Sequence, residues 1–109
     1  MRQVAVYFND VEAGILTEEH PGYGYTFKYN EKYLNSSFPR VSVNLPKRSE
    51  PYEAQHLFPF FANMLPEGAN RRIICRSLRI DEEDLFGLLV AMADQDFIGA
   101  VNVRSIKND

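Results

Sequence analysis

The side chains able to carry acid–base, nucleophilic or metal chemistry are few and scattered. The histidines are His20 and His56, and the single cysteine is Cys75. Their spacing is not that of a zinc site, and no histidine lies near Cys75 in the sequence to activate its thiol. His20 is expected to be solvated in a loop, His56 to lie at a helix start, and Cys75 to be a small buried hydrophobe. The sequence therefore predicts no catalytic residues, no metal and no cofactor, and a protein that is not an enzyme.

Two short motifs resemble ligand sites only superficially. The acidic run "DEED" at residues 81–84 is better explained by helix capping, since Asp81 is a good N-cap and acidic residues suit the positive end of a helix dipole. The stretch "GYG" at 22–24 is followed by neither a lysine nor a helix start, so it is no phosphate loop.

The segment "NRRIICRSLR" at 70–79 concentrates positive charge. In a helix Arg72, Arg76 and Arg79 share one face, at positions i, i+4 and i+7, and Arg71 accompanies them. One interpretation is a solvated helix face, and the other is a docking surface for an acidic protein. The acidic run that follows at once opposes binding to DNA.

The segment "LFPFFANMLPEG" at 57–68 is rich in large apolar residues. Its inward face is predicted to be core, but a helix in a two-layer domain cannot bury both faces. Phe58 or Phe60 is therefore a candidate for exposure, and contiguous exposed apolar area marks partner sites. Two interpretations stay open, namely core alone and core combined with an interface.

The composition is that of one small globular domain covering residues 1–109. Hydrophobic residues make up 45% and charged residues 25%, and the formal net charge is −3. Such a charge gives no general affinity for nucleic acid or for anionic membranes, and no apolar run reaches the roughly 18 residues of a membrane span. With no signal peptide at the N-terminus and one cysteine, we expect a cytoplasmic protein without direct nucleic-acid or membrane binding.

The first half of the chain is predicted to form strands. In residues 4–8, Val4, Val6 and Phe8 alternate with Ala5 and Tyr7 and lead through Asn9-Asp10 into a hairpin ending at Ile15-Leu16, with Gly14 free to take positive φ. Further strands are predicted at 25–30 and at 41–45, the latter with Val41, Val43 and Leu45 on one face. The segment 47–53 is expected to be a polar loop.

The second half is predicted to form three helices and a last strand. The first helix falls within 54–65 and begins near Leu57, because Pro59 is tolerated only in a first turn; its buried stripe is Leu57, Phe61, Met64 and Leu65. The second covers 67–78, with Ile74 and Leu78 inward. The third starts at an Asp81 N-cap, with Ile80 and Leu85 as a staple and Leu85, Leu88, Leu89 and Met92 as its buried stripe. A strand at 97–103 returns to the sheet. The predicted fold class is α+β, with a small, mostly antiparallel sheet and about three helices.

The order of these elements resembles the N-terminal subdomain of HipA-type toxin kinases. The matching motifs are "VYFNDVEAGIL", "YTFKYNEKYL", "VSVNLP", "LFPFFANMLPEG" and "DLFGLLVAMADQDFIGAVNV", which together span about residues 4–103. In full-length members of that family the subdomain leads into a serine/threonine kinase. This chain ends six residues after Val103, which leaves no room for a nucleotide-binding lobe.

A free-standing copy of this subdomain is similar to the HipS family of antitoxins. In three-component HipBST systems such a protein acts beside a HipT-like kinase toxin and a HipB-like DNA-binding protein. The resemblance therefore implies an antitoxin or regulatory subunit that neutralises a HipT-like serine/threonine kinase, with a HipB-like protein in a ternary complex. The alternative is the isolated N-terminal structural subdomain of a full-length HipA-like kinase.

One position departs from the family pattern. Members commonly carry a tryptophan directly after "LPEG", whereas this chain has Ala69 and no tryptophan at all. The departure favours control of kinase conformation, or of access to the kinase's phosphate loop, over direct plugging of its active site. The predicted kinase-binding site consists of Phe60, Glu67, Gly68, Ala69, Asn70 and Arg72.

Overall fold

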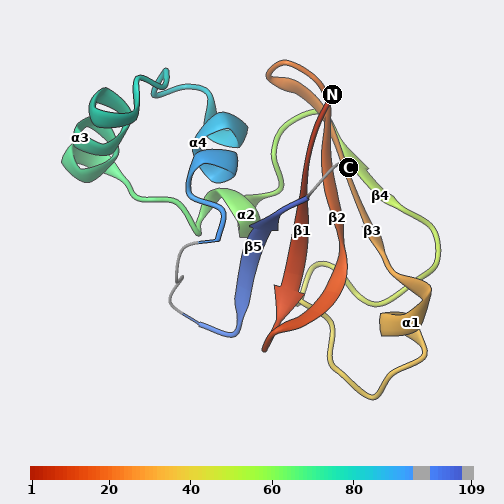
Figure 1. Cartoon of the computed structure of the whole chain (residues 1–109). Coiled ribbons are helices and arrows are strands. Elements are labelled where there is room, and N and C mark those ends of the chain that lie inside the picture. Colours follow the sequence, from red (N-terminus) through yellow and green to blue (C-terminus); the bar gives the residue numbers. More distant parts are fainter. Residues whose placement is uncertain (95–98, 107–109) are drawn as a thin grey trace.

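The structure, a computed structural model, describes residues 1–94 and 99–106. Its centre is an antiparallel five-stranded sheet in the order β4-β3-β2-β1-β5 (Figure 1). The strands are β1 (Arg2–Phe8), β2 (Val11–His20), β3 (Tyr23–Tyr29), β4 (Tyr52–Ala54) and β5 (Val101–Ser105). The helices are α1 (Glu31–Leu34), α2 (Pro59–Ala62), α3 (Gly68–Leu78) and α4 (Leu85–Ala91). The predicted α+β class is confirmed.

The predicted first hairpin is formed by β1 and β2. Asn9 and Asp10 both have positive φ, at 45° and 67°, as a tight hairpin turn requires. Gly14 does not use its freedom to take positive φ. It lies inside β2, where a Cβ would come within 2.4 Å of the Lys28 carbonyl oxygen. Glycine is therefore favoured at this position because it has no side chain, and not because of its backbone freedom.

The predicted strand at 41–45 is wrong. These residues form a turn closed by a single bridge between Ser42 and Leu45, and the edge of the sheet is instead occupied by β4, in a segment expected to be loop. Val41 and Leu45 are buried, but Val43 is 75% exposed. The alternation therefore predicted the burial of Val41 and Leu45 correctly, but it was wrong for Val43 and for the strand.

Tyrosine hydroxyls hold the long segment between α1 and β4 in place. The Tyr29 hydroxyl donates to the Leu45 carbonyl oxygen and accepts from the Val41 amide at 3.0 Å. The Tyr33 hydroxyl donates to the carbonyl oxygen of Pro39. Burial raises the pKa of both phenols, so they remain neutral donors.

One face of the sheet carries the core and is covered by α2 and α4. Phe61 of α2 lies 5.7 Å from the Phe27 ring, and Phe86 of α4 lies 6.0 Å from the Tyr25 ring. The fully buried side chains include Val4, Val6, Leu16, Phe27, Phe61, Phe86, Leu88, Leu89 and Val103. Aromatic side chains bury large areas each, so these contacts dominate the packing energy.

The helix predicted within 54–65 is shorter than expected. Only α2, a single turn beginning at Pro59, is helical, because the proline sets the start and the residues before it are extended. The predicted stripe still holds: Leu57, Phe61 and Leu65 are buried, and Met64 is partly buried against the core.

The predicted start of the last helix is wrong by one turn. Asp84, not Asp81, caps α4, and its Oδ1 accepts from the Gly87 amide at 3.0 Å. Asp81 instead accepts from the Glu83 amide in the preceding turn. Phe86, which was not predicted to be core, is fully buried, whereas Leu85 and Met92 are only partly buried.

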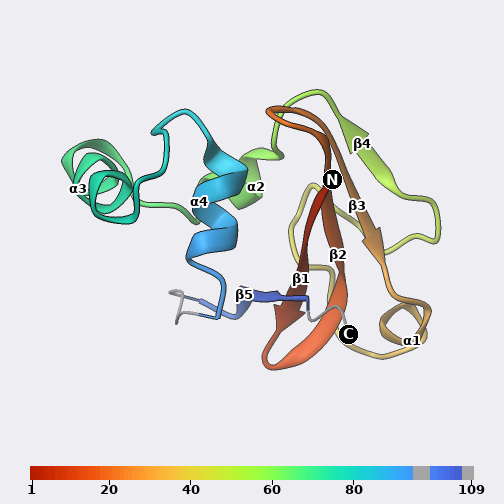
Figure 2. The ribbon, with the colours of Figure 1, turned by 45° about the horizontal axis from the view of Figure 1, so that its top comes forward.

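Helix α3 stands away from the sheet, and α4 lies between them (Figures 1 and 2). It was predicted at 67–78 and occupies 68–78, with Glu67 at its N-cap position. Leu78, predicted inward, is 47% exposed. The predicted closing strand corresponds to β5, which pairs with β1; Phe97 and Ile98 of the prediction lie outside the described residues. Among the described residues, no helix is long and apolar enough to cross a membrane.

Candidate protein-interaction surface

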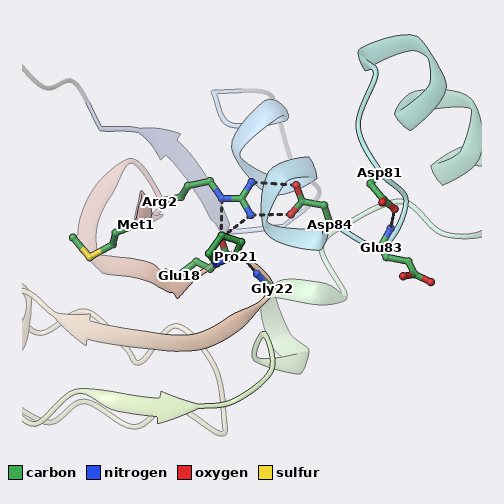
Figure 3. A pocket seen from close by; sticks show the side chains of 8 residues that line it. All are labelled: Met1, Arg2, Glu18, Pro21, Gly22, Asp81, Glu83 and Asp84. Atoms are coloured by element: carbon green, nitrogen blue, oxygen red, sulfur yellow. Dashed lines mark hydrogen bonds and ion pairs between the residues drawn. The ribbon is translucent and has the colours of Figure 1, made fainter.

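A group of paired charged side chains joins the start of the sheet to the start of α4 (Figure 3). Arg2 lies between two carboxylates: its Nε donates to Glu18 Oε1 at 2.8 Å, and its Nη2 donates to Asp84 Oδ1 at 2.8 Å. Glu18 is 2% exposed, and its other oxygen accepts from the Tyr25 hydroxyl and the Gly22 amide. Every polar group of this Arg2 cluster, defined as Arg2, Glu18, Tyr25 and Asp84, is paired.

The electrostatics of the Arg2 cluster favour its fixed charge states. The hydrogen bond from Arg2 lowers the pKa of Asp84, and the hydrogen bond with Asp84 raises the pKa of Arg2. Burial, helped by the hydrogen bond to Glu18, raises the pKa of Tyr25 to about 12. The pKa values of Arg2, Tyr25 and Asp84 therefore lie far from 7, so these groups do not exchange protons near pH 7. The cluster fastens α4 to the sheet and has the character of a structural tie.

The other sequence candidates for chemistry are not gathered into a site. Cys75 is buried in α3, and no group of three or more metal-binding side chains occurs in residues 1–94 and 99–106. His20 and His56 are both exposed. Neither histidine nor Cys75 therefore belongs to a metal-binding cluster in the part of the chain that the structure describes.

Helix α3 divides into two faces. Cys75 is 1% exposed and belongs to the core, and Ile74 packs partly against it. Arg71 also lies on this side, where its Nε donates to the Pro66 carbonyl oxygen at 2.8 Å and fixes the turn before the helix. Gly68 has a φ of +58°, a left-handed conformation that favours glycine at this turn.

The opposite face of α3 is solvent-exposed. We define the outward face of α3 as Ala69, Arg72, Ile73, Arg76 and Ser77. Ile73 is 67% exposed, which is unusual for a β-branched apolar side chain. Arg72 and Arg76 flank it, since residues three and four apart lie side by side on a helix. This face combines apolar area with positive charge, as protein-interaction surfaces do.

The structure brings five of the six predicted partner-binding residues together. Glu67, Gly68, Ala69 and Asn70 are exposed at the start of α3, and Arg72 is exposed one turn further on. Phe60 lies apart from them in α2, half-buried, with its ring 5.3 Å from that of Phe61. The predicted set is therefore one exposed cluster on α3 and one core-facing aromatic on α2.

The expectation that Phe58 or Phe60 is exposed is wrong. Both are partly buried and pack edge-on against Phe61. The exposed apolar side chains near this segment are instead Ile73 and Leu78 of α3. Sequence reasoning missed Ile73, although a signal was present: a helix that turns Cys75 inward cannot also bury a residue two positions before it.

The arrangement defines a small α+β domain without an assembled catalytic centre among its described residues, bearing an exposed helix suited to protein binding. The family model described as the HipA N-terminal domain matches residues 4–104. The chain belongs to this family, as its sequence motifs indicated, and the relation supports a toxin–antitoxin context.

Two curated relatives illustrate the family. An uncharacterized protein of Haemophilus influenzae is 34% identical over 94 residues, which cover 86% of this chain and 83% of the relative. A putative kinase, Y4mE, of Sinorhizobium fredii is 30% identical over 105 residues, which cover 94% of this chain but 24% of the relative. The domain therefore matches one protein nearly throughout and another as its smaller part.

Solved structures give the same fold. The N-terminal domain of HipA toxin matches with a TM-score of 0.70 and 26% identity, covering 98% of this chain and 96% of that one. The HipA, HipB and operator DNA complex of the Shewanella oneidensis MR-1 toxin–antitoxin system contains a chain that matches with a TM-score of 0.70, 19% identity and coverages of 96% and 24%. At that identity the second match bears on the fold alone.

Proposed function

We propose that this protein is a non-enzymatic antitoxin, or regulatory subunit, that binds and neutralises a HipT-like serine/threonine kinase in the cytoplasm. The observation that carries the proposal is the exposed helix α3 on a HipA N-terminal domain. A domain that packs on a kinase in a longer protein keeps its docking surface when it is a separate chain. Binding then has to offset the entropy of association, which exposed apolar and charged side chains can do.

The relative from Haemophilus influenzae supports a free-standing role, because this domain covers 83% of it. The structure of the HipA, HipB and operator DNA complex suggests a HipB-like protein as a third component of the proposed assembly. This chain itself is proposed not to bind DNA directly, given its net charge of −3.

A second candidate function is that of a structural subdomain acting only in covalent linkage to its kinase. The putative kinase of Sinorhizobium fredii favours it, since the domain accounts for 24% of that protein. The two functions differ in whether the domain works when it is supplied as a separate chain.

Co-expression distinguishes the two functions. The chain is supplied either separately from the cognate kinase or fused to its N-terminus, and growth is followed while both proteins are quantified by immunoblotting. The proposal predicts that growth is restored by the separate chain. Growth arrest that persists with both proteins folded and abundant, or that is relieved only by the fusion, contradicts it.

Single substitutions then test the predicted contact residues. Glu67→Ala and Asn70→Ala change exposed side chains and should weaken kinase binding while the Tm stays within a few degrees. Phe60→Ala should also weaken binding, but it removes a ring packed on Phe61, so its effect on stability must be measured in the same preparation. Binding that is indifferent to all three substitutions places the contact elsewhere.

A further inference from the structure

The outward face of α3 is continuous along the helix. Its members, Ala69, Arg72, Ile73, Arg76 and Ser77, follow the spacing i, i+3, i+4, i+7 and i+8, which is one side of an α-helix. They line a shallow hollow of about 330 Å³. Helix α3 stands away from the sheet (Figure 2), and all five residues of this face are exposed.

The centre of this face is apolar. Ile73 is 67% exposed, whereas the neighbouring Ile74 packs against the core. The small side chains of Ala69 and Ser77 on either side leave its methyl groups accessible. A partner residue that covers Ile73 removes apolar surface from water, which favours association.

The charges on the face are unmatched. In residues 1–94 and 99–106, neither Arg72 nor Arg76 has a hydrogen-bond or ion-pair partner, unlike Arg71, which is held by Pro66. Guanidinium groups bind carboxylates with two parallel hydrogen bonds and lose less hydration than ammonium groups on burial. Arg72 and Arg76 on either side of Ile73 therefore favour a partner surface on which carboxylates flank an apolar residue.

The surroundings disfavour a nucleic acid. A second hollow next to the start of α3 is lined by Arg71 and Arg72 together with Asp81, Glu82 and Glu83. Those three carboxylates repel a continuous phosphate backbone, while a protein surface can place its carboxylates on Arg72 and Arg76 and avoid them.

We propose that the outward face of α3 binds an acidic protein surface, one with an apolar centre flanked by carboxylates, through Ile73, Arg72 and Arg76. This inference rests on the proposed function, in which that surface belongs to the kinase. The inference goes beyond the proposed function in two ways. It extends the contact from the start of α3 along the helix to Arg76, and it specifies the chemistry of the partner surface.

Charge reversal with a matched control tests the inference. Kinase affinity is measured by calorimetry for the wild type, for Arg72→Glu/Arg76→Glu, for Ile73→Ala and for Lys32→Glu/Arg40→Glu. The control pair changes the net charge equally, and its residues lie in and after α1, at the opposite end of the molecule from α3 (Figure 1). Titrations at about 150 and 500 mM salt compare strong with weak electrostatic interaction, and thermal melts verify folding.

We expect the Arg72/Arg76 reversal to weaken binding about tenfold or more and to remove most of its salt dependence, with the control pair within about twofold of wild type. Ile73→Ala should weaken binding several-fold without changing the salt dependence. Wild-type affinity in the folded Arg72/Arg76 variant overturns the inference and leaves the proposed function intact. No binding by the wild-type chain overturns both. Duplex DNA binding by this chain alone, lost on the same reversal, also overturns the inference.

Discussion

Arg2 and Asp84 lie 82 positions apart in the chain and are joined by two parallel hydrogen bonds, Nη1 to Oδ2 at 3.1 Å and Nη2 to Oδ1 at 2.8 Å. The same carboxylate also caps α4 by accepting from the Gly87 amide. One side chain therefore fixes both where the helix begins and where it sits on the sheet.

Replacing Asp84 with alanine should lower the free energy of unfolding by about 1–3 kcal/mol at pH 7, because a cap and a paired carboxylate are lost together. Arg2 holds the pKa of Asp84 below its usual value of 3.8. The stabilisation is therefore present above that usual value and is lost as the pH falls through the lower folded pKa. Urea unfolding from pH 7 to pH 2 should show the difference between variant and wild type shrinking below about pH 4.

Asp10→Asn is the matched control for this experiment, because asparagine tolerates the positive φ of 67° at this turn position. Asp10 pairs with Arg104, but its side chain is 84% exposed. Solvent screening makes such a pair weak, so this variant should lie close to wild type at every pH. A pH-independent loss in Asp84→Ala contradicts the role assigned to the carboxylate charge.

Tyr25→Phe should reduce the fall in the free energy of unfolding at alkaline pH. The pKa of Tyr25 is raised to about 12 by burial and by the hydrogen bond to Glu18, from an ordinary value of 10.0. Between these two values the unfolded chain loses the proton and the folded chain keeps it, so the free energy of unfolding falls as the pH rises. Denaturant melts from pH 9 to 12 should show a shallower fall in the variant. Tyr23→Phe, at a position that is 53% exposed, should follow wild type.

Gly87→Ala should destabilise the protein although alanine is the better helix former. A Cβ at this position comes within 2.1 Å of Asp84 Oδ2 and 3.0 Å of Arg2 Nη1, so the carboxylate has to leave the cap. In an Asp84→Ala background the main clash is absent, and the same change should be neutral or stabilising by up to about 1 kcal/mol. A double-mutant cycle by chemical denaturation measures the change of sign. Equal losses in both backgrounds contradict the steric account.

Arg79→Gly should raise the free energy of unfolding by about 1 kcal/mol, because Arg79 ends α3 in the left-handed conformation, with φ 58° and ψ 47°, which strains a residue with a Cβ. Arg76→Gly removes the same charge inside the helix and should cost about 1 kcal/mol instead. Thermal and denaturant melts compare the two. A loss of stability in Arg79→Gly is the contrary result.

Phe61→Ala should cost about 3–5 kcal/mol, since this fully buried ring contacts Phe27, Phe58 and Phe60. Phe60→Ala should cost clearly less, because that side chain is only partly buried. Equilibrium unfolding of both variants in parallel tests the order. Similar losses in the two contradict the division of this segment into a core side and a more open side.

Local patterns predicted the hairpin, the buried stripe of Leu57, Phe61 and Leu65, and the extent of α3 to within a residue. Each depends on interactions close in sequence, such as the turn at Asn9-Asp10. The resemblance to HipA-type proteins then predicted the fold as a whole, which the family match confirms.

The failures come from distant partners. The segment at 41–45 has the alternation of a strand. Its Val41 amide and Leu45 carbonyl oxygen, however, hydrogen-bond to the Tyr29 hydroxyl and not to a neighbouring strand. Asp81 and Asp84 are equally good caps by type, and Arg2, far away in the sequence, decides between them. The exposure of Ile73 depends on where α3 lies relative to the sheet, which helical periodicity alone does not specify.

The place of β5 beside β1 also orders events during synthesis on the ribosome. Strands β1 to β3 are neighbours along the chain and can pair as soon as they emerge, but α4 and β5 are made after all of them. Until then the apolar face with Leu16 and Phe27 has no α4 to cover it, and the outer edge of β1 has no partner. A nascent chain of this protein is therefore most vulnerable to aggregation and to chaperone capture before residues 85–105 are translated.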